Sequence, residues 1–257
     1  MDFFGDPCTA SWQTPKGDVN PPDRLRHSYR VPLRITVAGE DPLAELVLEK
    51  LEVEGLSPVD LTVRPAECVA LTGPSGSGKT RLLRAVCDME PHSGAIRLGE
   101  TYCEQTPAPL WRRRVGFLPT ESRWWKEAVG EHFRDVPEKW LDRMGLDPEV
   151  MQWPVSRLSS GERQRLAVLR LLANVPDALL LDEPTANLDP NNRDRVEFFL
   201  TDYIQSNGAA CLWVSHDSEQ MDRISRRCYE IRDGRLFQVR EGGPSNGRAA
   251  AADTGSR

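Results

Sequence analysis

Short runs of apolar residues alternate along the chain with segments in which apolar positions recur every three or four residues. The first pattern is typical of buried strands, and the second is typical of amphipathic helices. We expect strands over residues 44–51, 59–63, 68–72, 95–98, 115–118, 178–181, 210–214, 228–232 and 236–239. We expect helices over residues 80–87, 137–144, 161–173, 193–206 and 218–225. This alternation predicts an α/β fold on a mainly parallel sheet.

The two ends of the chain lack this periodicity. Residues 1–42 mix Gly, Pro, Asp and Thr, and residues 241–257 are rich in Gly, Ala and Ser. We expect a flexible N-terminal extension and a disordered tail, with one domain over residues 43–240. Within that domain, residues 120–160 lack strand character and carry four of the seven tryptophans. We interpret them as a short helical subdomain.

Composition narrows the class of protein. The chain has 257 residues, of which 39% are hydrophobic, and 33 Lys and Arg against 39 Asp and Glu give a net charge of −6. An acidic chain is not drawn to nucleic acid by its overall field, so we expect no nucleic-acid partner. No apolar run approaches the roughly 20 residues that span a bilayer. The six cysteines are scattered without a CxxC pair. We therefore expect a reduced cytoplasmic protein that reaches a membrane only through a partner.

A glycine-rich segment joins the expected strand at 68–72 to the expected helix at 80–87. It comprises Gly73, Pro74, Ser75, Gly76, Ser77, Gly78, Lys79 and Thr80, and it fits the phosphate-loop pattern GxxxxGK[ST]. Backbone N–H groups in such a loop surround phosphate oxygens, Lys79 reaches the β- and γ-phosphates, and the Thr80 hydroxyl ligates Mg²⁺. We count Arg81, the next residue, among the nucleotide contacts. The alternative is a chance glycine loop, which the flanking strand and helix disfavour.

Two carboxylates follow the apolar run at 178–181. A strand of this kind is buried on both faces, and its carboxyl end opens into the crevice where ligands of α/β sheets bind. We expect Asp182 to hold Mg²⁺ beside Thr80, and Glu183 to polarise the water that attacks the γ-phosphate. The alternative for both residues is an ordinary polar turn after a strand.

Between these motifs, Ser159 and Glu162 are spaced as a capping box, which predicts the start of a helix with exposed N–H groups. In chain order, the sequence then contains GPSGSGKT, LSSGERQR, LLLDEP, ANLD and SHD. This ordered set, within residues 44–239, resembles the ATP-binding cassette (ABC) ATPases. It matches their Walker A, signature, Walker B, D-loop and switch-histidine motifs.

The resemblance implies a P-loop NTPase fold with an antiparallel β edge, ATP and Mg²⁺ as ligands, and ATP hydrolysis. It also implies a homodimer that closes head to tail, in which each copy offers its signature turn to the nucleotide of the other. The residues of that turn are Ser159, Ser160, Gly161 and Glu162. Glu183 then acts as general base, His216 orients the attacking water, and Asp189 couples the two sites. As alternatives, His216 is structural and Asp189 is a turn residue before Pro190.

The sequence departs from the family in three places, of which Ser160, in place of the second glycine of the signature, is a mild change. Thr120 stands where the family carries a glutamine that senses Mg²⁺, so we retain its shorter hydroxyl as a metal-ligand candidate, with Glu121 as a substitute. Residues 53–58 offer no aromatic side chain to stack on adenine. We therefore expect weaker binding or a relaxed choice between ATP and GTP.

The resemblance points to the ATPase subunit of a bacterial membrane transporter, peripheral on the inner face of the membrane through a permease subunit. Trp124 and Trp125 either anchor a helix of that permease or pack inside the helical subdomain. The arginines at 112–114 are interpreted as a solvated helix face, with contact to a nucleotide or a partner as the alternative. The alternative function is a soluble ABC ATPase that acts as an assembly scaffold or ATP-driven switch. The long coiled coil of DNA-repair relatives is missing from the sequence.

Overall fold

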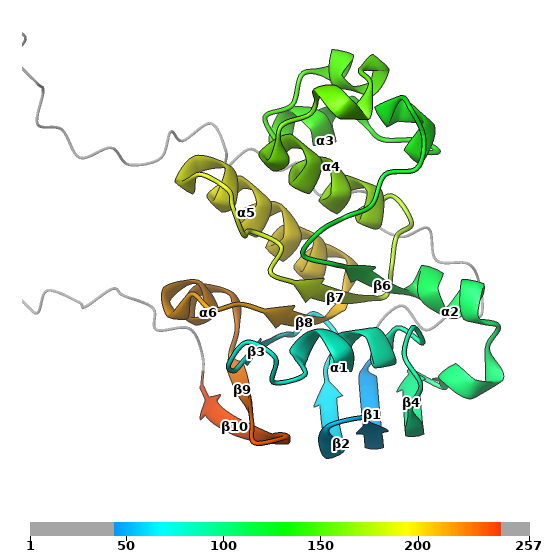
Figure 1. The fold of residues 1–257 in the computed structure, drawn as a ribbon, viewed down its shortest axis with the longest axis vertical. Coiled ribbons are helices and arrows are strands. Elements are labelled where there is room, and N and C mark those ends of the chain that lie inside the picture. Colours follow the sequence, from blue (N-terminus) through cyan, green and yellow to red (C-terminus); the bar gives the residue numbers. More distant parts are fainter. Residues whose placement is uncertain (1–43, 243–257) are drawn as a thin grey trace, which may run out of the picture.

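The computed structural model describes residues 44–242. The predictions for residues 1–42 and for 243–257 lie outside the described part. Two sheets, a layer of helices and a small helical subdomain make up the described chain (Figure 1). The predicted α/β class and the mainly parallel sheet are confirmed.

The larger sheet positions the candidate site. Its strand order is β10-β9-β3-β8-β7-β6. The strands are β10 (Arg235–Glu241), β9 (Arg227–Arg232), β3 (Cys68–Thr72), β8 (Ala210–Val214), β7 (Ala178–Asp182) and β6 (Val115–Leu118). All neighbouring pairs are parallel except β9 and β10, which are antiparallel. Every residue of β7 and β8 is buried, as expected for apolar runs at the centre of a parallel sheet.

The smaller sheet forms the predicted antiparallel edge of the domain. Its order is β2-β1-β4-β5, with β1 (Leu46–Val53), β2 (Leu56–Val63), β4 (Ser93–Leu98) and β5 (Thr101–Tyr102). Strand β5 was not expected, because two half-buried residues carry no readable alternation. Helix α1 (Lys79–Val86) lies between the two sheets (Figure 1). Its buried face joins apolar residues of both sheets in one core cluster.

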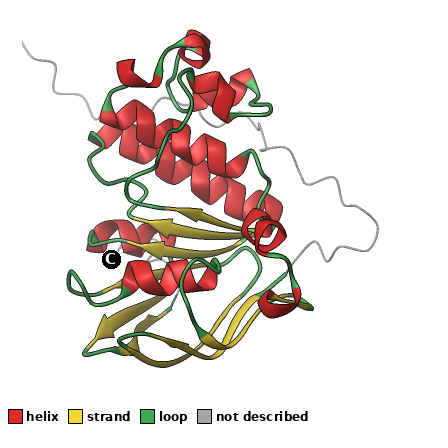
Figure 2. Cartoon of the chain, turned by 45° about the vertical axis from the view of Figure 1, so that its right-hand side comes forward, coloured by secondary structure: helices red, strands yellow, loops and turns green. Residues whose placement is uncertain are grey.

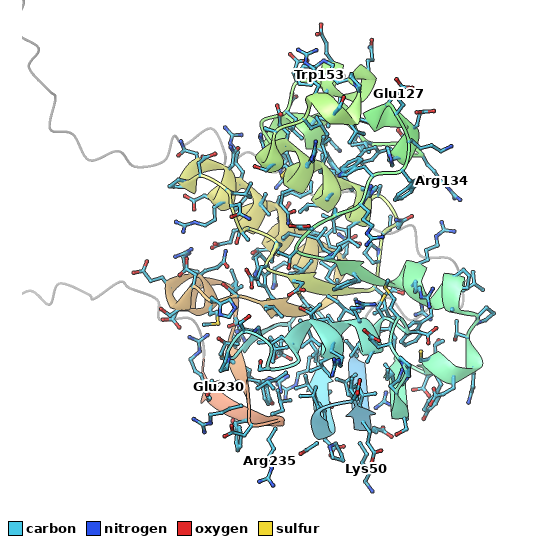
Figure 3. The ribbon with its side chains drawn as sticks, viewed as in Figure 1. Lys50, Glu127, Arg134, Trp153, Glu230 and Arg235 are labelled. Atoms are coloured by element: carbon cyan, nitrogen blue, oxygen red, sulfur yellow. The ribbon has the colours of Figure 1, made fainter. Side chains whose placement is uncertain are left out.

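The other face of the larger sheet is covered by α4 (Ser160–Leu172) and α5 (Pro190–Asn207), with α6 (Ser218–Ile224) near β9 and β10 (Figure 2). A second core cluster fills this layer and continues into the helical subdomain. There α3 (Glu138–Arg143) presents Trp140 edge-on to Phe199, with ring centroids 5.5 Å apart. Short 3-10 turns at Val129–His132, Pro148–Gln152 and Val155–Arg157 complete the subdomain. The labelled side chains Glu127 and Trp153 mark its outer surface (Figure 3).

The structure differs from the expectations about helices in three respects. Helix α2 (Ala108–Arg114) was missed, because it is short and Trp111 is its one buried residue. The arginines at its end are not all a solvated face, since Arg114 Nε donates to Asp177 Oδ2 at 2.8 Å and is half-buried. Helix α5 begins at Pro190 rather than residue 193, because Asp189 caps it and proline fits the first helical position. No helix within residues 44–242 is long and apolar enough to cross a bilayer.

Candidate functional site

The loop that follows β3 is pre-shaped by its glycines and by Lys79. Gly73 has φ of +140°, and a Cβ there would lie 2.4 Å from the Ile231 carbonyl oxygen, so only glycine fits. The buried Lys79 ammonium donates to the carbonyl oxygens of Gly73 and Pro74 at 2.8 and 2.9 Å. Burial lowers the pKa of Lys79, while the carboxylates of Glu183 and Asp182 act in the opposite direction.

One hydroxyl in this loop has no partner. Ser77 Oγ is buried and makes no hydrogen bond. A buried polar atom without a partner is costly unless a ligand satisfies it. The loop also ends at the N-terminus of α1, where backbone N–H groups favour an anion. These features fit a bound phosphate chain. Arg81 is turned elsewhere: its Nη1 donates to the Glu54 carbonyl in the β1–β2 turn at 2.8 Å.

The predicted metal ligands Thr80 and Asp182 meet at the carboxyl edge of the sheet. Thr80 Oγ1 donates to Asp182 Oδ2 at 2.7 Å, and Asp182 is buried. Within residues 44–242 no group of three or more His, Cys, Asp or Glu side chains forms a cation site by itself. One hydroxyl and one carboxylate leave further positions for phosphate oxygens and water, which suits Mg²⁺. Thr120 is exposed two residues beyond β6, at the same edge, and stays a prediction as a ligand.

Glu183 and His216 face each other across the ends of β7 and β8. His216 Nε2 lies 3.2 Å from Glu183 Oε1, and both side chains are partly exposed. Glu183 has φ of +51°, an uncommon conformation for a residue with a side chain. Its N–H is held by the Val214 carbonyl at 3.2 Å. Such strain persists only where the surrounding structure fixes it, and it turns this carboxylate away from the regular path of β7.

The signature turn opens helix α4 with the predicted capping box. Ser159 Oγ accepts from the Glu162 N–H at 3.2 Å, and Glu162 Oε2 accepts from the Ser159 N–H at 2.9 Å. The Ser159 hydroxyl also donates to Glu162, and these bonds lower the pKa of Glu162. Ser160 is exposed and Gly161 is half-buried. Among the hydrogen bonds of residues 44–242, none joins this turn to the phosphate loop of the same copy.

Asp189 caps helix α5, a structural role that the sequence analysis did not predict. Its Oδ1 accepts from the Asn192 N–H at 3.1 Å and its Oδ2 from the Asn192 side chain at 2.6 Å. These bonds lower the pKa of Asp189. The side chain is exposed, so the cap leaves it open to a second molecule. Its coupling role stays a prediction.

Comparison with known proteins identifies the family. Residues 56–186 match the family model described as ABC transporter. The chain belongs to the ABC transporter family. It is 36% identical over 202 residues to the lipoprotein-releasing system ATP-binding protein LolD 1 of Rhodospirillum rubrum, covering 70% of this chain and 88% of that protein. It is 37% identical over 185 residues to the aliphatic sulfonates import ATP-binding protein SsuB 3 of Nocardia farcinica, covering 70% of this chain and 72% of that protein.

A plant relative and a solved structure extend the comparison. Protein STAR1 of Oryza sativa subsp. japonica is 33% identical over 259 residues, which covers 91% of this chain and 73% of that protein. A bacterial Atm1-family ABC exporter solved with ATP bound superposes with a TM-score of 0.67 over 78% of this chain and 39% of that chain, at 20% identity. At that identity the exporter confirms the fold alone. The chain is an ABC ATPase, as the motifs predicted.

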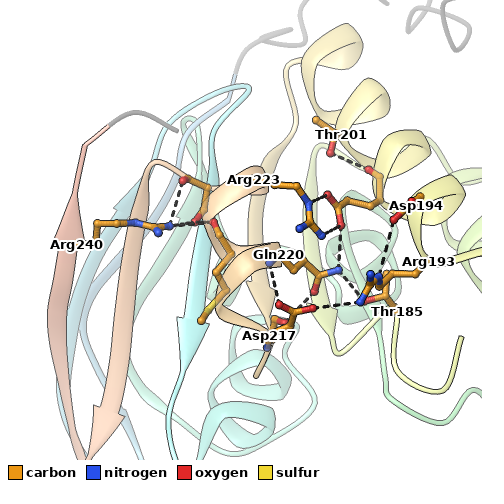
Figure 4. A network of polar contacts seen from close by, with 12 residues as sticks. Thr185, Arg193, Asp194, Thr201, Asp217, Gln220, Arg223 and Arg240 are labelled. Carbon is orange, nitrogen blue, oxygen red and sulfur yellow. Dashed lines mark hydrogen bonds and ion pairs between the residues drawn. The ribbon is translucent and has the colours of Figure 1, made fainter. Parts of the chain in front are cut away.

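Two buried glutamines of this ABC ATPase were missed by sequence reasoning. Gln164 of α4 donates to the Pro184 carbonyl at 3.0 Å, one residue after Glu183. Gln220 of α6 belongs to a polar network in which it donates to Thr185 Oγ1 at 2.8 Å (Figure 4). Gln220 lies outside the sequence motifs, and Gln164 lies within the signature segment LSSGERQR without a chemical role assigned to it there. Their positions follow from contacts between elements far apart in the sequence.

A second feature of the ABC ATPase is a groove of about 380 Å³ between the larger sheet and the helical subdomain. Arg112, Arg134 and Arg170 line it, and its lining holds no Asp or Glu. The two tryptophans of this region have different environments. Trp124 is partly buried against the second core cluster, which fits the packing alternative, and Trp125 is 67% exposed.

Arg170 lies over both tryptophan rings, with its guanidinium 4.4 Å from the Trp124 centroid and 5.0 Å from the Trp125 centroid. His132 fixes the turn that carries them. Its Nε2 accepts from the N–H groups of Trp125 and Lys126 at 3.0 and 2.9 Å. The exposed indole of Trp125 is therefore held in place at the rim of the groove.

Proposed function

We propose that this ABC ATPase is the ATP-hydrolysing subunit of a membrane transporter, and that two copies close head to tail around two Mg-ATP. The observation that carries the proposal is the pair of contacts at one sheet edge, Thr80 with Asp182 and Glu183 with His216. Each copy thus holds a phosphate loop, a metal-ligand pair and a base. The signature turn is a separate helix end, available to a second copy.

The proposed chemistry assigns each residue one task. The loop N–H groups and Lys79 hold the β- and γ-phosphates, and Lys79 exchanges its bonds to Gly73 and Pro74 for phosphate oxygens. Thr80 and Asp182 would hold Mg²⁺, which neutralises charge that develops on the phosphates. Glu183 accepts the proton of the attacking water, and His216, whose Nε2 lies 3.2 Å from Glu183 Oε1, orients that water.

Coupling to transport requires a membrane partner. The names of the bacterial relatives describe ATP-binding proteins of a lipoprotein-releasing system and of sulfonate import. We assign the groove of Arg112, Arg134 and Arg170 to a cytoplasmic segment of a permease subunit, with Trp125 as its exposed anchor. Tryptophan and arginine are the residues most often found at interface hot spots. This ABC ATPase then lies at the cytoplasmic face of the membrane through that permease.

The dimer is tested with Glu183→Gln, which removes the proton acceptor but leaves the shape of the site. We expect light scattering to report a dimer of this variant in saturating ATP and magnesium, and a monomer without ATP. A Glu183→Gln protein that stays monomeric overturns the head-to-tail arrangement. Co-purification of a multi-span membrane protein with the tagged wild type tests transport. If only soluble proteins co-purify, the alternative of a soluble scaffold or switch is favoured instead.

A further inference from the structure

Gln220 connects the two loops that carry Glu183 and His216. It is 1% exposed, although its side chain is a polar amide. Its Oε1 accepts from Ser215 Oγ at 2.8 Å, and its Nε2 donates to Thr185 Oγ1, also at 2.8 Å. Ser215 directly precedes His216, and Thr185 lies two residues after Glu183. One side chain therefore bonds to both loops (Figure 4).

The anchoring of Gln220 is rigid at both ends. Its backbone N–H donates to Asp217 Oδ1 at 3.0 Å, which caps helix α6. Its Nε2 also lies 3.3 Å from Glu197 Oε2, and Arg223 holds both oxygens of that carboxylate at 2.9 and 3.0 Å. The Ser215 hydroxyl is fixed in turn, because it accepts from the Asp217 N–H at 3.0 Å. The amide is thus held by α5, α6 and the end of β8.

An amide suits this place for a chemical reason. It offers an acceptor at one end and donors at the other, and it carries no charge. The donor end meets a hydroxyl and a carboxylate, and the acceptor end meets a hydroxyl. A carboxylate at the same position would stand against Glu197 with like charge. An apolar side chain would leave the buried Ser215 hydroxyl without its acceptor.

We propose that Gln220 is a positioning residue for hydrolysis, which fixes the Glu183 loop against the His216 loop and so maintains the 3.2 Å contact between the base and the histidine. Glu183 needs such support, because its positive φ is stable only when its surroundings fix it. Gln164 supports the same loop from α4 through Pro184. This inference rests on the roles of Glu183 and His216 in the proposed function.

The test compares Gln220→Leu with wild type in steady-state ATP hydrolysis. The phosphate loop is untouched, so KM for ATP should stay within twofold. The value of kcat should fall by about tenfold or more, because small misplacements of a general base carry penalties of that order. Gln205→Leu is the matched control: Gln205 is exposed and donates only to the Ala66 carbonyl, so both constants should stay at wild-type values.

A second variant cuts the same link at its other end. Thr185→Val removes the hydroxyl that receives the Gln220 donor while keeping the size of the side chain. It should lower kcat alone, and the double variant should lose less than the product of the two single losses, because both remove one link. Independent, multiplicative losses overturn the proposal. The Thr185→Val variant also tests the proposal if Gln220→Leu fails to fold.

The charge pattern gives a third arm. Gln220→Glu should lower kcat, and Glu197→Gln added to it should recover most of the loss, because amide and carboxylate have then exchanged places. No recovery overturns the proposal. So does a kcat for Gln220→Leu within twofold of wild type, or a fall in kcat matched by an equal loss of ATP affinity. A wild type that hydrolyses no ATP instead defeats the proposed function.

Discussion

Gly161→Ala distinguishes the effect of this position on the stability of the fold from its effect on the activity of the signature turn. Gly161 is the second residue of α4, and its φ is not in the left-handed region. A Cβ built there would meet Leu188 Cδ2 at 3.4 Å, which is ordinary van der Waals contact. The folded chain therefore has room for a methyl group. Alanine also costs less backbone entropy than glycine in a helix.

From this geometry we expect Gly161→Ala to keep or slightly raise the free energy of unfolding, by up to about 0.5 kcal/mol. Activity should change in the opposite direction. The added methyl group would cover the helix end that is proposed to approach a γ-phosphate, and loss of a backbone donor at such a position costs on the order of 100-fold in rate. Stability and activity should thus move apart.

Urea unfolding measures the first effect, and ATP hydrolysis with light scattering measures the second. Gly242→Ala is the control, because a Cβ there meets nothing within 4 Å. A Gly161→Ala protein with wild-type hydrolysis and ATP-driven dimerisation would refute the assignment of this turn to the partner's nucleotide. A loss of more than about 1 kcal/mol in unfolding free energy would refute the steric argument itself.

Further outcomes are expected in urea unfolding. Ser159→Ala should lose about 1 kcal/mol with the α4 cap, and Leu180→Ala about 3 kcal/mol from the core. Gly116→Ala should lose about 1–3 kcal/mol, because its Cβ would lie 2.6 Å from Leu171 Cδ1. Burial raises the pKa of Glu67, but its bonds to Arg227 and Arg64 outweigh burial and lower it. The Glu67–Arg227 pair therefore stabilises the folded protein at pH values above the ordinary glutamate pKa. This stabilisation is lost as the pH falls through the lower pKa that Glu67 has in the folded state. Arg227→Gln should therefore lower the free energy of unfolding at pH 7 and lower it much less in acid.

The parts of the site that are local in sequence could be predicted from it. The phosphate loop is one contiguous segment, and the Ser159–Glu162 capping box spans one helical turn. The bounds of β3, β6 and β8 match the predicted ranges, because each is a short apolar run between polar residues. The predicted start of α5 was three residues late, although an aspartate before a proline is a helix-start signal.

Contacts between distant elements were out of reach of this reasoning. The buried polar side chains that support Glu183 come from α4 and α6, which lie 20 and 35 residues away from their partners along the chain. Gln164 bonds to a backbone carbonyl, which every residue type has. The contact therefore cannot be predicted from the types of the two residues. Gln220 bonds to the hydroxyls of Ser215 and Thr185, which come close together only when β7 pairs with β8.

The same argument explains why motif residues and supporting residues differ in how they tolerate change. Thr80 and Asp182 act through oxygen atoms that must contact the ligand directly, so the residue type at each of these two positions is restricted. Gln220 acts through the distance it keeps between two loops, so any side chain arrangement with the same polarity and length could serve. The expected recovery on exchanging amide and carboxylate between positions 220 and 197 follows from this reasoning. The position of the two loops depends on where the hydrogen-bond donor and acceptor lie, and not on which of the two residues supplies them.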